Sequence, residues 1–283
     1  MLRIVTIVVA VLTASVAFAG EPYRLVSFNI RFGSANDGPD RWEVRSPKVI
    51  ETIRDLDADV LGLQEALPFQ IRELLAALPR YAATGVSRED GKVDGEASPI
   101  LFDRARFTLA GAGTFWLSDT PDAVGTNTWG AACNRVCSWA RLVDLGTGEA
   151  FVVFNTHWDH VSQLAREGSA ALIAERAVTI AGDEPYVVMG DLNAAEDNEA
   201  MATLLGRGGG APLVDAYRVV HPEARAGTFT GFRTDSDGGA AKIDYVLVSR
   251  GWRVRDAGID RRTIDGRFPS DHFPVWAVLS FGD

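Results

Sequence analysis

Short hydrophobic runs alternate along the chain with longer segments that have a helical pattern of hydrophobic positions. The short runs are rich in β-branched and aromatic residues and predict strands, whereas the longer segments predict helices. The predicted strands are Arg24–Ile30, Val60–Gln64, Ile100–Phe102, Thr108–Trp116, Ser138–Leu145, Phe151–Thr156, Tyr186–Met189, Ile243–Val248 and Val275–Phe281. The predicted helices are Ser46–Asp55, Pro68–Leu78, Ser162–Ala181 and Asn198–Leu205. This alternation favours a layered α/β domain.

Three segments rich in glycine and charged residues are expected to be loops, namely Arg88–Ala97, Gly206–Gly210 and Asp235–Ala240. The length of the chain would allow two domains. However, the motifs near Asn29 and His272 make chemical sense only if they meet in one site. Residues 20–283 are therefore expected to form a single catalytic domain.

The first nineteen residues have the pattern of a secretory signal peptide. Arg3 precedes an apolar run that extends to Phe18, and Ala17-Phe18-Ala19 forms a small-x-small cleavage pattern. The alternative is a retained membrane anchor, but the run is short for a bilayer span. We expect residues 1–19 to be removed and the protein to be exported to the periplasm or the exterior, without stable membrane insertion.

The charge balance bears on the class of partner. With 28 basic and 38 acidic residues, the formal net charge is −10, and loss of Arg3 with the signal peptide would make it −11. Proteins that bind nucleic acid without sequence preference use basic surface to neutralise phosphates. The composition therefore argues against a stoichiometric nucleic-acid-binding protein. It does not exclude an enzyme, because a bound cation brings its own positive charge to the site.

Cys133 and Cys137 are the two cysteines of the chain. Because export places a protein in an oxidising compartment, the sequence predicts a short-loop disulfide between them. A structural zinc site is not supported, since no second pair of cysteines or histidines lies nearby.

Polar residues follow several predicted strands at the point where each strand ends. They are Asn29, Gln64-Glu65, Asn155-Thr156-His157 and Gly190-Asp191-Leu192-Asn193. Ligands of α/β folds commonly bind beyond the ends of the strands. The repetition of this pattern predicts a binding or catalytic site at one edge of the sheet.

Three of the four histidines lie in two short acidic segments, His157-Trp158-Asp159-His160 and Asp271-His272. This clustering predicts catalytic or ligand roles for His157 and His272, whereas His160 could either take part or brace the turn. Asp244 is an acid on an otherwise apolar strand, where an unpaired carboxylate would be costly. We expect it to pair with His272. The alternative is a structural salt bridge to Lys242 or an arginine.

The remaining polar residues of these segments offer oxygen atoms rather than thiolates. Oxygen ligands select hard cations, so the sequence predicts Mg²⁺, with Mn²⁺ or Ca²⁺ as alternatives. The candidates are Asn29, Glu65, Asp191, Asn193 and Asp271. A rival is a zinc site made of His157, Asp159 and His160, although residues so close in sequence at a strand end do not converge easily.

Six motifs occur in an order that resembles the endonuclease/exonuclease/phosphatase superfamily, and the intervening segments resemble an often exported bacterial subgroup. The motifs are Ser27-Phe28-Asn29-Ile30, Gln64-Glu65, Asn155-Thr156-His157, Gly190-Asp191-Leu192-Asn193, Lys242-Ile243-Asp244-Tyr245 and Ser270-Asp271-His272-Phe273-Pro274. The resemblance covers nearly the whole chain after residue 19. It implies a four-layer sandwich, in which two packed mixed β-sheets are flanked by helices and the site lies at one edge.

The resemblance also implies roles for single residues. Glu65 would be the main metal ligand, helped by Asn29 and Asp271. Asp191 would orient or deprotonate the attacking water, and Asn193 would help to hold this water and the phosphate. The metal would act as a Lewis acid during an in-line attack.

The two histidines would contact the substrate directly. His272, paired with Asp244, and His157 would bind the phosphoryl oxygens and stabilise the developing negative charge. The implied activity is that of a metal-dependent phosphoester hydrolase, most simply a phosphodiesterase or nuclease. The alternatives are a phosphomonoesterase for a sugar phosphate, inositol phosphate or other small metabolite, an enzyme acting on phospholipid head groups, and a non-catalytic binding module.

Three further residues are candidates for substrate binding. Glu96 could reach the metal region from its loop, or be a solvated acid. Arg166 could contact phosphate, or pair with a carboxylate such as Asp159. Trp158 lies between catalytic-type residues and could line the substrate cleft, although buried packing is common for tryptophan.

Overall fold

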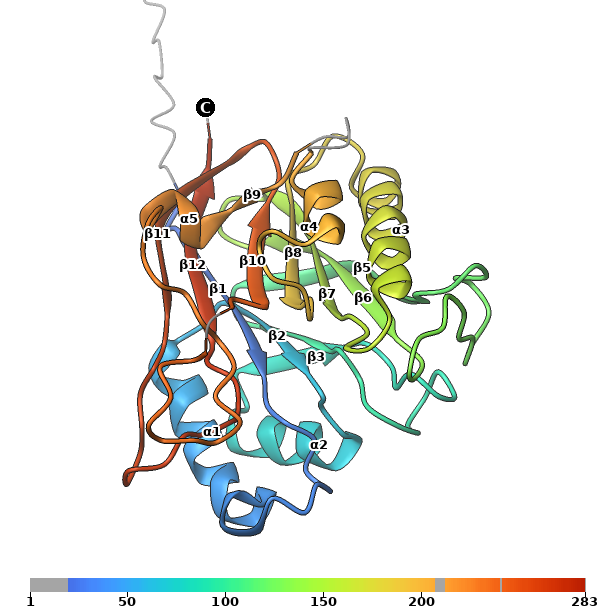
Figure 1. Ribbon diagram of the computed structural model, residues 1–283. Helices are drawn as coiled ribbons and strands as arrows, with labels where there is room; N and C mark the ends of the chain where they lie inside the picture. Colours follow the sequence, from blue (N-terminus) through green and yellow to red (C-terminus); the bar gives the residue numbers. More distant parts are fainter. Residues whose placement is uncertain (1–19, 207–211, 240, 283) are drawn as a thin grey trace, which may run out of the picture.

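Two six-stranded β-sheets pack face to face, and helices cover the outer face of each sheet (Figure 1). This computed structural model describes residues 20–206, 212–239 and 241–282. The predicted signal peptide, most of the predicted loop Gly206–Gly210 and the last residue of the loop Asp235–Ala240 lie outside the described residues. Within the described part, no helix has the length and apolar character needed to cross a membrane.

The first sheet has the strand order β11-β12-β1-β2-β4-β3, and its central pair, β1 and β2, is parallel. The neighbouring pairs β1–β12, β2–β4, β3–β4 and β11–β12 are antiparallel. Its strands are β1 (Tyr23–Asn29), β2 (Val60–Gln64), β3 (Tyr81–Thr84), β4 (Ile100–Asp103), β11 (Trp252–Ile259) and β12 (Val275–Phe281).

The second sheet has the order β5-β6-β7-β8-β10-β9 and again a parallel central pair, β7 and β8. All its other neighbours are antiparallel. Its strands are β5 (Phe107–Trp116), β6 (Val136–Asp144), β7 (Ala150–His157), β8 (Tyr186–Asp191), β9 (Val214–Asp215) and β10 (Asp244–Val248).

Three hydrophobic clusters hold the layers together. One fills the space between the sheets, with residues such as Leu25 of β1 and Val187 of β8. A second joins the first sheet to α1 (Trp42–Leu56) and α2 (Pro68–Ala77). The third joins the second sheet to α3 (Gln163–Ala181) and α4 (Glu199–Leu204). Helix, sheet, sheet and helix form four layers, which confirms the predicted four-layer α/β sandwich.

The predicted elements are present, with small shifts at their ends. Ser162 and Asn198, predicted as first helical residues, are the N-caps of α3 and α4 and accept hydrogen bonds from backbone amides. The prediction missed β3, β9, β11, the short helix α5 (Ala216–Val220) and a 3₁₀ turn at Gly38–Asp40. These elements are short, or, as in β11, alternate with exposed polar residues at a sheet edge, so their hydrophobic pattern is weak.

Strand register brings the predicted site residues to one edge. Asn29 and Gln64 are partners at the ends of the parallel strands β1 and β2. His157 and Asp191 are partners at the ends of the parallel strands β7 and β8. Asp244 begins the antiparallel strand β10 opposite Asp191. Because the sheets face each other, the four strand ends and the start of β10 surround one point.

A buried amide pair joins the two sheets directly beneath this point. Gln64 donates from Nε2 to Oδ1 of Asn155 over 2.6 Å, and Asn155 donates to the carbonyl oxygens of Leu63 and Pro99. A Cβ atom at Gly62 would lie 2.6 Å from Oδ1 of Asn155, so only glycine leaves room for the pair. These two motif residues therefore support the site without lining it.

The expected disulfide is absent, and this prediction is wrong. Cys133 and Cys137 are both free. Cys137 lies in β6 and is completely buried in the cluster between the second sheet and α3, whereas Cys133 borders the pocket described below. The two thiols belong to different environments, which explains why they do not pair.

Lys242 is completely buried, and its Nζ donates to Oδ2 of Asp215 over 2.6 Å. The ammonium also lies 3.4 Å from the centroid of the Tyr245 ring. Lys242 therefore does not pair with Asp244, which was the alternative partner considered for that carboxylate. Burial lowers the pKa of Lys242, and the carboxylate of Asp215 opposes this shift.

Lys242→Met is expected to lower the free energy of unfolding by about 3–5 kcal/mol, because it leaves a carboxylate without its cation in the interior. Urea unfolding followed by circular dichroism measures this change. The double variant Lys242→Met/Asp215→Asn should recover part of the loss. A change below about 1 kcal/mol in the single variant would contradict the assigned role of the pair.

Candidate active site

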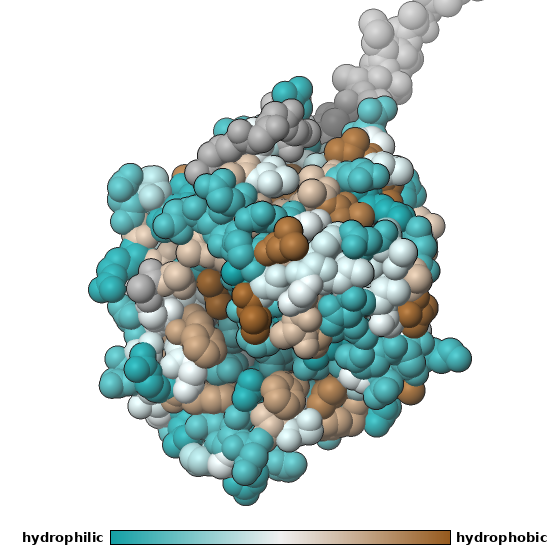
Figure 2. Space-filling model, turned by 45° about the vertical axis from the view of Figure 1, so that its right-hand side comes forward, coloured by the Kyte–Doolittle hydropathy of each residue, from teal (hydrophilic) through white to brown (hydrophobic). Residues whose placement is uncertain are grey.

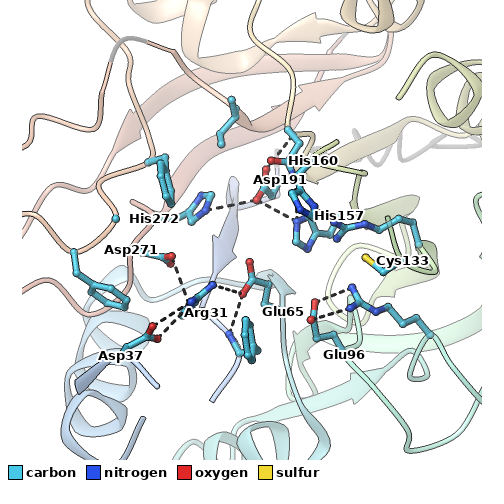
Figure 3. A pocket seen from close by; sticks show the side chains of 18 residues that line it. Arg31, Asp37, Glu65, Glu96, Cys133, His157, His160, Asp191, Asp271 and His272 are labelled. Carbon is cyan, nitrogen blue, oxygen red and sulfur yellow. Dashed lines mark hydrogen bonds and ion pairs between the residues drawn. The ribbon is translucent and has the colours of Figure 1, made fainter. Parts of the chain in front are cut away.

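A pocket of about 500 Å³ opens where the strand ends meet. Loops after β1, β2, β7 and β8 and the loops around residues 229–232 and 271–272 form its walls (Figure 3). The predicted site residues that line it are Glu65, Glu96, His157, Asp191, Asn193, Asp271 and His272. Asn29 lies behind them, fully buried. Thus all of the predicted metal ligands and most of the predicted catalytic residues come together.

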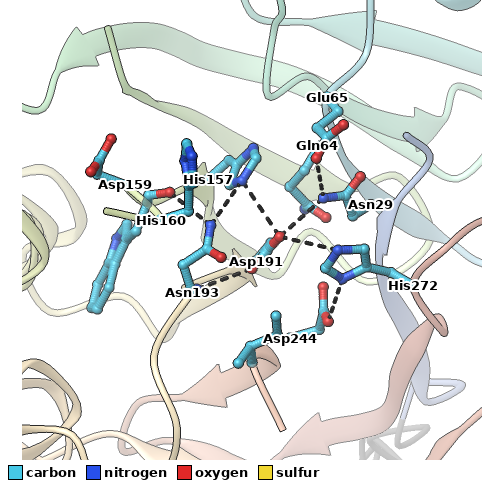
Figure 4. Close-up of polar contacts among 12 residues, drawn as sticks. Asn29, Gln64, Glu65, His157, Asp159, His160, Asp191, Asn193, Asp244 and His272 are labelled. Carbon is cyan, nitrogen blue, oxygen red and sulfur yellow. Dashed lines mark hydrogen bonds and ion pairs between the residues drawn. The ribbon is translucent and has the colours of Figure 1, made fainter. Parts of the chain in front are cut away.

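Asp191 is at the centre of a polar network (Figure 4). Its Oδ2 accepts a hydrogen bond from Nδ2 of Asn29 over 3.0 Å. The same oxygen lies 3.5 Å from Nε2 of His157 and 3.7 Å from Nε2 of His272. Its Oδ1 accepts from the backbone N–H of Asn193 over 3.0 Å. The carboxylate is therefore held in one orientation between two imidazoles.

His272 forms the predicted pair with Asp244. Its Nδ1 lies 2.9 Å from Oδ2 of Asp244, and both side chains are buried. Burial opposes the charged ring, but the carboxylates of Asp244 and Asp191 outweigh it and raise the pKa of His272 well above its usual value. Nε2 therefore carries a proton that faces Asp191 and the pocket.

His157 is held in the opposite protonation state. Burial, reinforced by the positive charges of Arg135 and Arg88, lowers the pKa of His157 well below its usual value. Nδ2 of Asn193 lies 3.0 Å from Nε2 of His157 and donates to it, since the neutral ring can accept there. Asn193 also donates to the carbonyl of Trp158 over 3.0 Å. The site thus combines one neutral and one cationic imidazole.

Burial and the neighbouring Asp244 raise the pKa of Asp191 to about 7. A carboxylate with a pKa near neutrality is suited to accept a proton from water. A pKa shifted this far in a pocket is characteristic of a functional residue.

We expect kcat to rise with pH up to a plateau, with a midpoint at or below about 7. Protonation of Asp191 at low pH removes the base, whereas His272 keeps its proton above neutrality. A divalent cation nearby would favour the carboxylate and lower the midpoint. The pH profile of kcat under saturating substrate measures this dependence, and a kcat that falls as the pH rises from 5 to 7 would contradict it.

The opposite wall of the pocket carries the predicted metal ligands. Nδ2 of Asn29 donates to Oε1 of Glu65 over 3.1 Å. The guanidinium of Arg31 lies 3.8 Å from carboxylate oxygens of both Glu65 and Asp271, and it is held by two hydrogen bonds to Asp37. Burial raises the pKa of Asp271, and the cationic His272 opposes this shift. Two carboxylates from different loops therefore converge on one positive charge.

Among the residues that the structure describes, two groups could hold a metal ion. In Asp191, Asp244 and His272, the ligand atoms all lie within 4.8 Å of one another. In this group, however, Asp244 and His272 already share a direct hydrogen bond, so the two side chains are arranged to hold a proton between them rather than a metal ion. The carboxylate oxygens of Glu65 and Asp271 suit a hard cation, because both already face a cationic group. Asn29 lies beside them, with its Nδ2 toward Glu65 and its Oδ1 accepting from the backbone N–H of Arg31 over 2.9 Å. This second set fits a divalent cation best.

Several residues of the site have strained backbone conformations, which set the directions of their side chains. Glu65 and Asn193 have positive φ angles of 57° and 46°, which are uncommon for residues other than glycine. At Gly190 the φ is 152°, and a Cβ atom would lie 2.0 Å from the carbonyl oxygen of Thr156. Strain of this kind gathers at functional sites.

Two predicted substrate-binding residues do not reach the pocket. Trp158 is completely buried in the hydrophobic cluster of the second sheet, so it contributes backbone atoms rather than a stacking surface. Arg166 does not line the pocket, and it donates to the carbonyl oxygen of Asp159 and to the side chain of Gln163. Both expectations of substrate contact are therefore corrected.

The rival zinc site is also excluded by geometry. Asp159 is completely buried, and its carboxylate accepts hydrogen bonds from the backbone amides of Ala132, Val161 and Ser162. Figure 4 shows it pointing away from Asp191. His160 lines the pocket, but its Nδ1 contacts Nη2 of Arg135 over 2.9 Å. Its part in bracing the wall is thus visible in the structure.

Several pocket residues were not singled out from the sequence. They are Arg31, Phe32, Asp37, Arg88, Arg135, Phe229 and Phe232. Arg31 directly follows the motif Ser27-Phe28-Asn29-Ile30, which ends a predicted strand. Its position in the sequence could therefore have indicated that it lies in the site. The others lie in loops without a periodic pattern, and only the folded chain brings them together.

The amino-acid sequence matches the Endonuclease/Exonuclease/phosphatase family over residues 26–272. Solved structures of chains with similar sequences support this family assignment. An endonuclease/exonuclease/phosphatase from Bacteroides vulgatus is 33% identical, with a TM-score of 0.87 over 93% of this chain and 100% of that chain. A mannosyl-6-phosphatase from Bacteroides thetaiotaomicron is 32% identical, with a TM-score of 0.83 over 92% of this chain and 100% of that chain.

Nocturnin from Drosophila melanogaster is 27% identical over 289 residues, which cover 93% of this chain but only 42% of Nocturnin. The protein therefore spans less than half of that relative. The family match extends over most of the chain and includes all the residues that line the pocket. The protein belongs to the Endonuclease/Exonuclease/phosphatase family.

Proposed function

We propose that the protein is a metal-dependent phosphomonoesterase that acts on a small phosphorylated sugar or a similar metabolite. The observation that carries the proposal is the position of Asp191 at the centre of a bounded pocket. It lies between a neutral His157 and a cationic His272, opposite an oxygen-rich ligand set. This arrangement can activate water beside a phosphoryl group.

Asp191 accepts a proton from the attacking water, since its buried carboxylate has a pKa near neutrality. His272 donates a hydrogen bond from Nε2 to a phosphoryl oxygen, and Asp244 keeps the ring oriented and charged. Asn193 and His157 form the other side of the phosphoryl site, where Asn193 is anchored by the carbonyl of Trp158. These groups are in place before the substrate binds, which favours the transition state.

Mg²⁺, with Mn²⁺ or Ca²⁺ as alternatives, would be held by Glu65 and Asp271, and by Asn29 once its amide oxygen is turned toward the ion. The ion would supply Lewis-acid stabilisation of phosphoryl charge. Asn29 donates to both Glu65 and Asp191, so it links the predicted metal ligands to the base. A change in the position of the Glu65 or the Asp191 carboxylate would therefore affect the position of the other through Asn29.

Three observations favour a small monoester over the nuclease or diesterase considered from the sequence. The pocket volume of about 500 Å³ lies in the usual range for small-molecule sites. The net charge of −10 does not attract a polyanionic strand. A relative that is 32% identical over its whole length is named a mannosyl-6-phosphatase. On the face shown in Figure 2, hydrophobic side chains lie singly or in small groups among hydrophilic ones, which gives little support for docking on lipid.

A substrate panel tests this proposal. The purified protein, with Mg²⁺ or with EDTA, is offered mannose 6-phosphate, glucose 6-phosphate, p-nitrophenyl phosphate, bis-p-nitrophenyl phosphate, plasmid DNA and RNA. We expect turnover of the monoesters with Mg²⁺ and none with EDTA. Preferred turnover of the diester or of nucleic acid would overturn the monoesterase assignment while leaving the hydrolase assignment intact.

We also propose that the chain is exported and cleaved after Ala19, on the basis of its leader pattern alone. Mass spectrometry of protein recovered from the outside of the inner membrane should give an N-terminus at Gly20. Recovery of the uncleaved chain from the cytoplasm would contradict this proposal.

A further inference from the structure

One wall of the pocket is a loop that hydrogen bonds hold in place. The backbone N–H of Arg88 donates to the carbonyl of Glu96 over 2.9 Å, and that of Glu89 donates to the carbonyl of Asp94 over 3.2 Å. Nε1 of Trp116 donates to the carbonyl of Arg88 over 2.6 Å. The side chains that this loop presents to the pocket therefore start from a fixed backbone.

Arg88 and Glu96 form a two-pronged pair on this wall. Nη1 and Nη2 of Arg88 each donate to one carboxylate oxygen of Glu96 over 2.9 Å. Both side chains line the pocket and keep limited exposure, 14% for Arg88 and 17% for Glu96. In Figure 3 Glu96 lies across the pocket from His272, on the far side of Glu65.

The pair lies close to the proposed phosphoryl site. Ala66 and Ala97 form a β-bridge, with N–H to O distances of 3.3 and 2.8 Å, and they directly follow Glu65 and Glu96. A small recess beside the main pocket is lined by Glu65, Glu96 and His157 together. A substrate whose phosphate lies beside Asp191 can therefore place the rest of the molecule near Glu96.

The charges within this pair are balanced, because Nη1 and Nη2 of Arg88 are both bound to Glu96. A second phosphate would have to displace Glu96 to bind that face of the guanidinium. Hydroxyl groups fit better, because an arginine and a carboxylate held side by side offer hydrogen-bond donors and acceptors at neighbouring positions. Two adjacent hydroxyls of a sugar can each donate to Glu96 and accept from Arg88.

Three aromatic side chains also line the pocket, Phe32, Phe229 and Phe232. Phe229 is 46% exposed, and its ring centroid lies 4.9 Å from that of His272. Aromatic rings of this kind can cover the apolar face of a sugar ring while the charged pair binds its hydroxyl edge. The pocket therefore offers both aromatic and charged surfaces to a substrate.

We propose that Arg88 and Glu96 are specificity residues that bind adjacent hydroxyl groups of a hexose 6-phosphate. This inference rests on the proposed phosphomonoesterase function and names the part of the chain that selects a neutral, hydroxyl-rich leaving group. Arg88 and Glu96 bind the substrate away from the reacting atoms, so they affect KM for sugar phosphates rather than the chemical step.

The test compares Glu96→Gln and Arg88→Lys with the wild type on mannose 6-phosphate and p-nitrophenyl phosphate. Loss of charge-assisted hydrogen bonds should raise KM for mannose 6-phosphate by about tenfold or more, with kcat changed by less than about threefold. Neither constant should change by more than about threefold for p-nitrophenyl phosphate, which has no sugar hydroxyls. Asp94→Asn, at an exposed acid of the same loop that lies outside the pocket lining, is the matched control and should behave as the wild type.

Equal losses in kcat on both substrates would overturn the inference, since Glu96 would then act on the metal or on the reaction. Unchanged kinetics on both substrates would also overturn it. A wild type that hydrolyses neither monoester would contradict the proposed function instead. In that case calorimetry with mannose 6-phosphate tests whether Arg88 and Glu96 bind the sugar. Binding that is at least about tenfold weaker in Glu96→Gln than in the wild type would support this role. Equal binding, or no binding, in both proteins would overturn it.

Discussion

Asp191→Asn is expected to lower kcat by about 10³–10⁴-fold, because the amide cannot accept the proton of the attacking water. Asparagine has the same shape, and its one amide oxygen can keep one of the two hydrogen bonds that Asp191 accepts, from Asn29 to Oδ2 and from the backbone N–H of Asn193 to Oδ1, each over 3.0 Å. The fold and substrate binding should therefore persist. Stopped assays at saturating substrate measure the loss in kcat.

The control for this prediction is the thermal unfolding midpoint of Asp191→Asn, which should stay within a few degrees of the wild type, since the neutral amide avoids the cost of burying a carboxylate and this offsets the lost hydrogen bond. The variant should also lose the rise of kcat with pH around neutrality. A loss of less than about tenfold in kcat would show that another group takes the proton.

Glu65→Gln is expected to have the second large effect, a loss of about 10²–10³-fold in kcat/KM at limiting Mg²⁺. Removing this carboxylate removes the main charged ligand of the predicted cation, whose Lewis-acid contribution is worth several kcal/mol. Raising the Mg²⁺ concentration should restore part of the activity, whereas it should not rescue Asp191→Asn. Mg²⁺ titration by activity and by calorimetry measures both effects.

Glu51→Gln serves as the matched control, because Glu51 is an exposed glutamate on α1, remote from the pocket lining. It should bind Mg²⁺ as the wild type does. Unchanged Mg²⁺ affinity in Glu65→Gln would contradict the assignment of Glu65, and would direct attention to the cluster of Asp191, Asp244 and His272.

The centre of the site was predictable because it is built from strand ends. Asn29, His157 and Asp191 each end a central strand whose hydrophobic pattern is strong in the sequence. Parallel register then places His157 beside Asp191 in one sheet and Asn29 beside Gln64 in the other, and the packing of the two sheets brings Asn29 to Asp191. The pairing of Asp244 with His272 followed from the cost of leaving a carboxylate unpaired on a buried strand.

The walls were not predictable to the same degree. Arg88 and Phe229 lie in loops, where no period indicates which side chains face inward. Trp158 lies between two site residues, but its large apolar ring is buried in the core instead. The disulfide was inferred from the expected compartment, and the separate environments of Cys133 and Cys137 could be known only from the fold.

The most direct test of the proposed hydrolysis is to follow phosphate release from mannose 6-phosphate in ¹⁸O-labelled water, with Mg²⁺ and after EDTA treatment. An attack by water on phosphorus, assisted by Asp191, predicts one ¹⁸O atom in each phosphate released, and no release after EDTA. Phosphate without the label would mean that water attacks carbon, and release that persists in EDTA would mean that no metal is needed. Either result would contradict the mechanism proposed for this pocket.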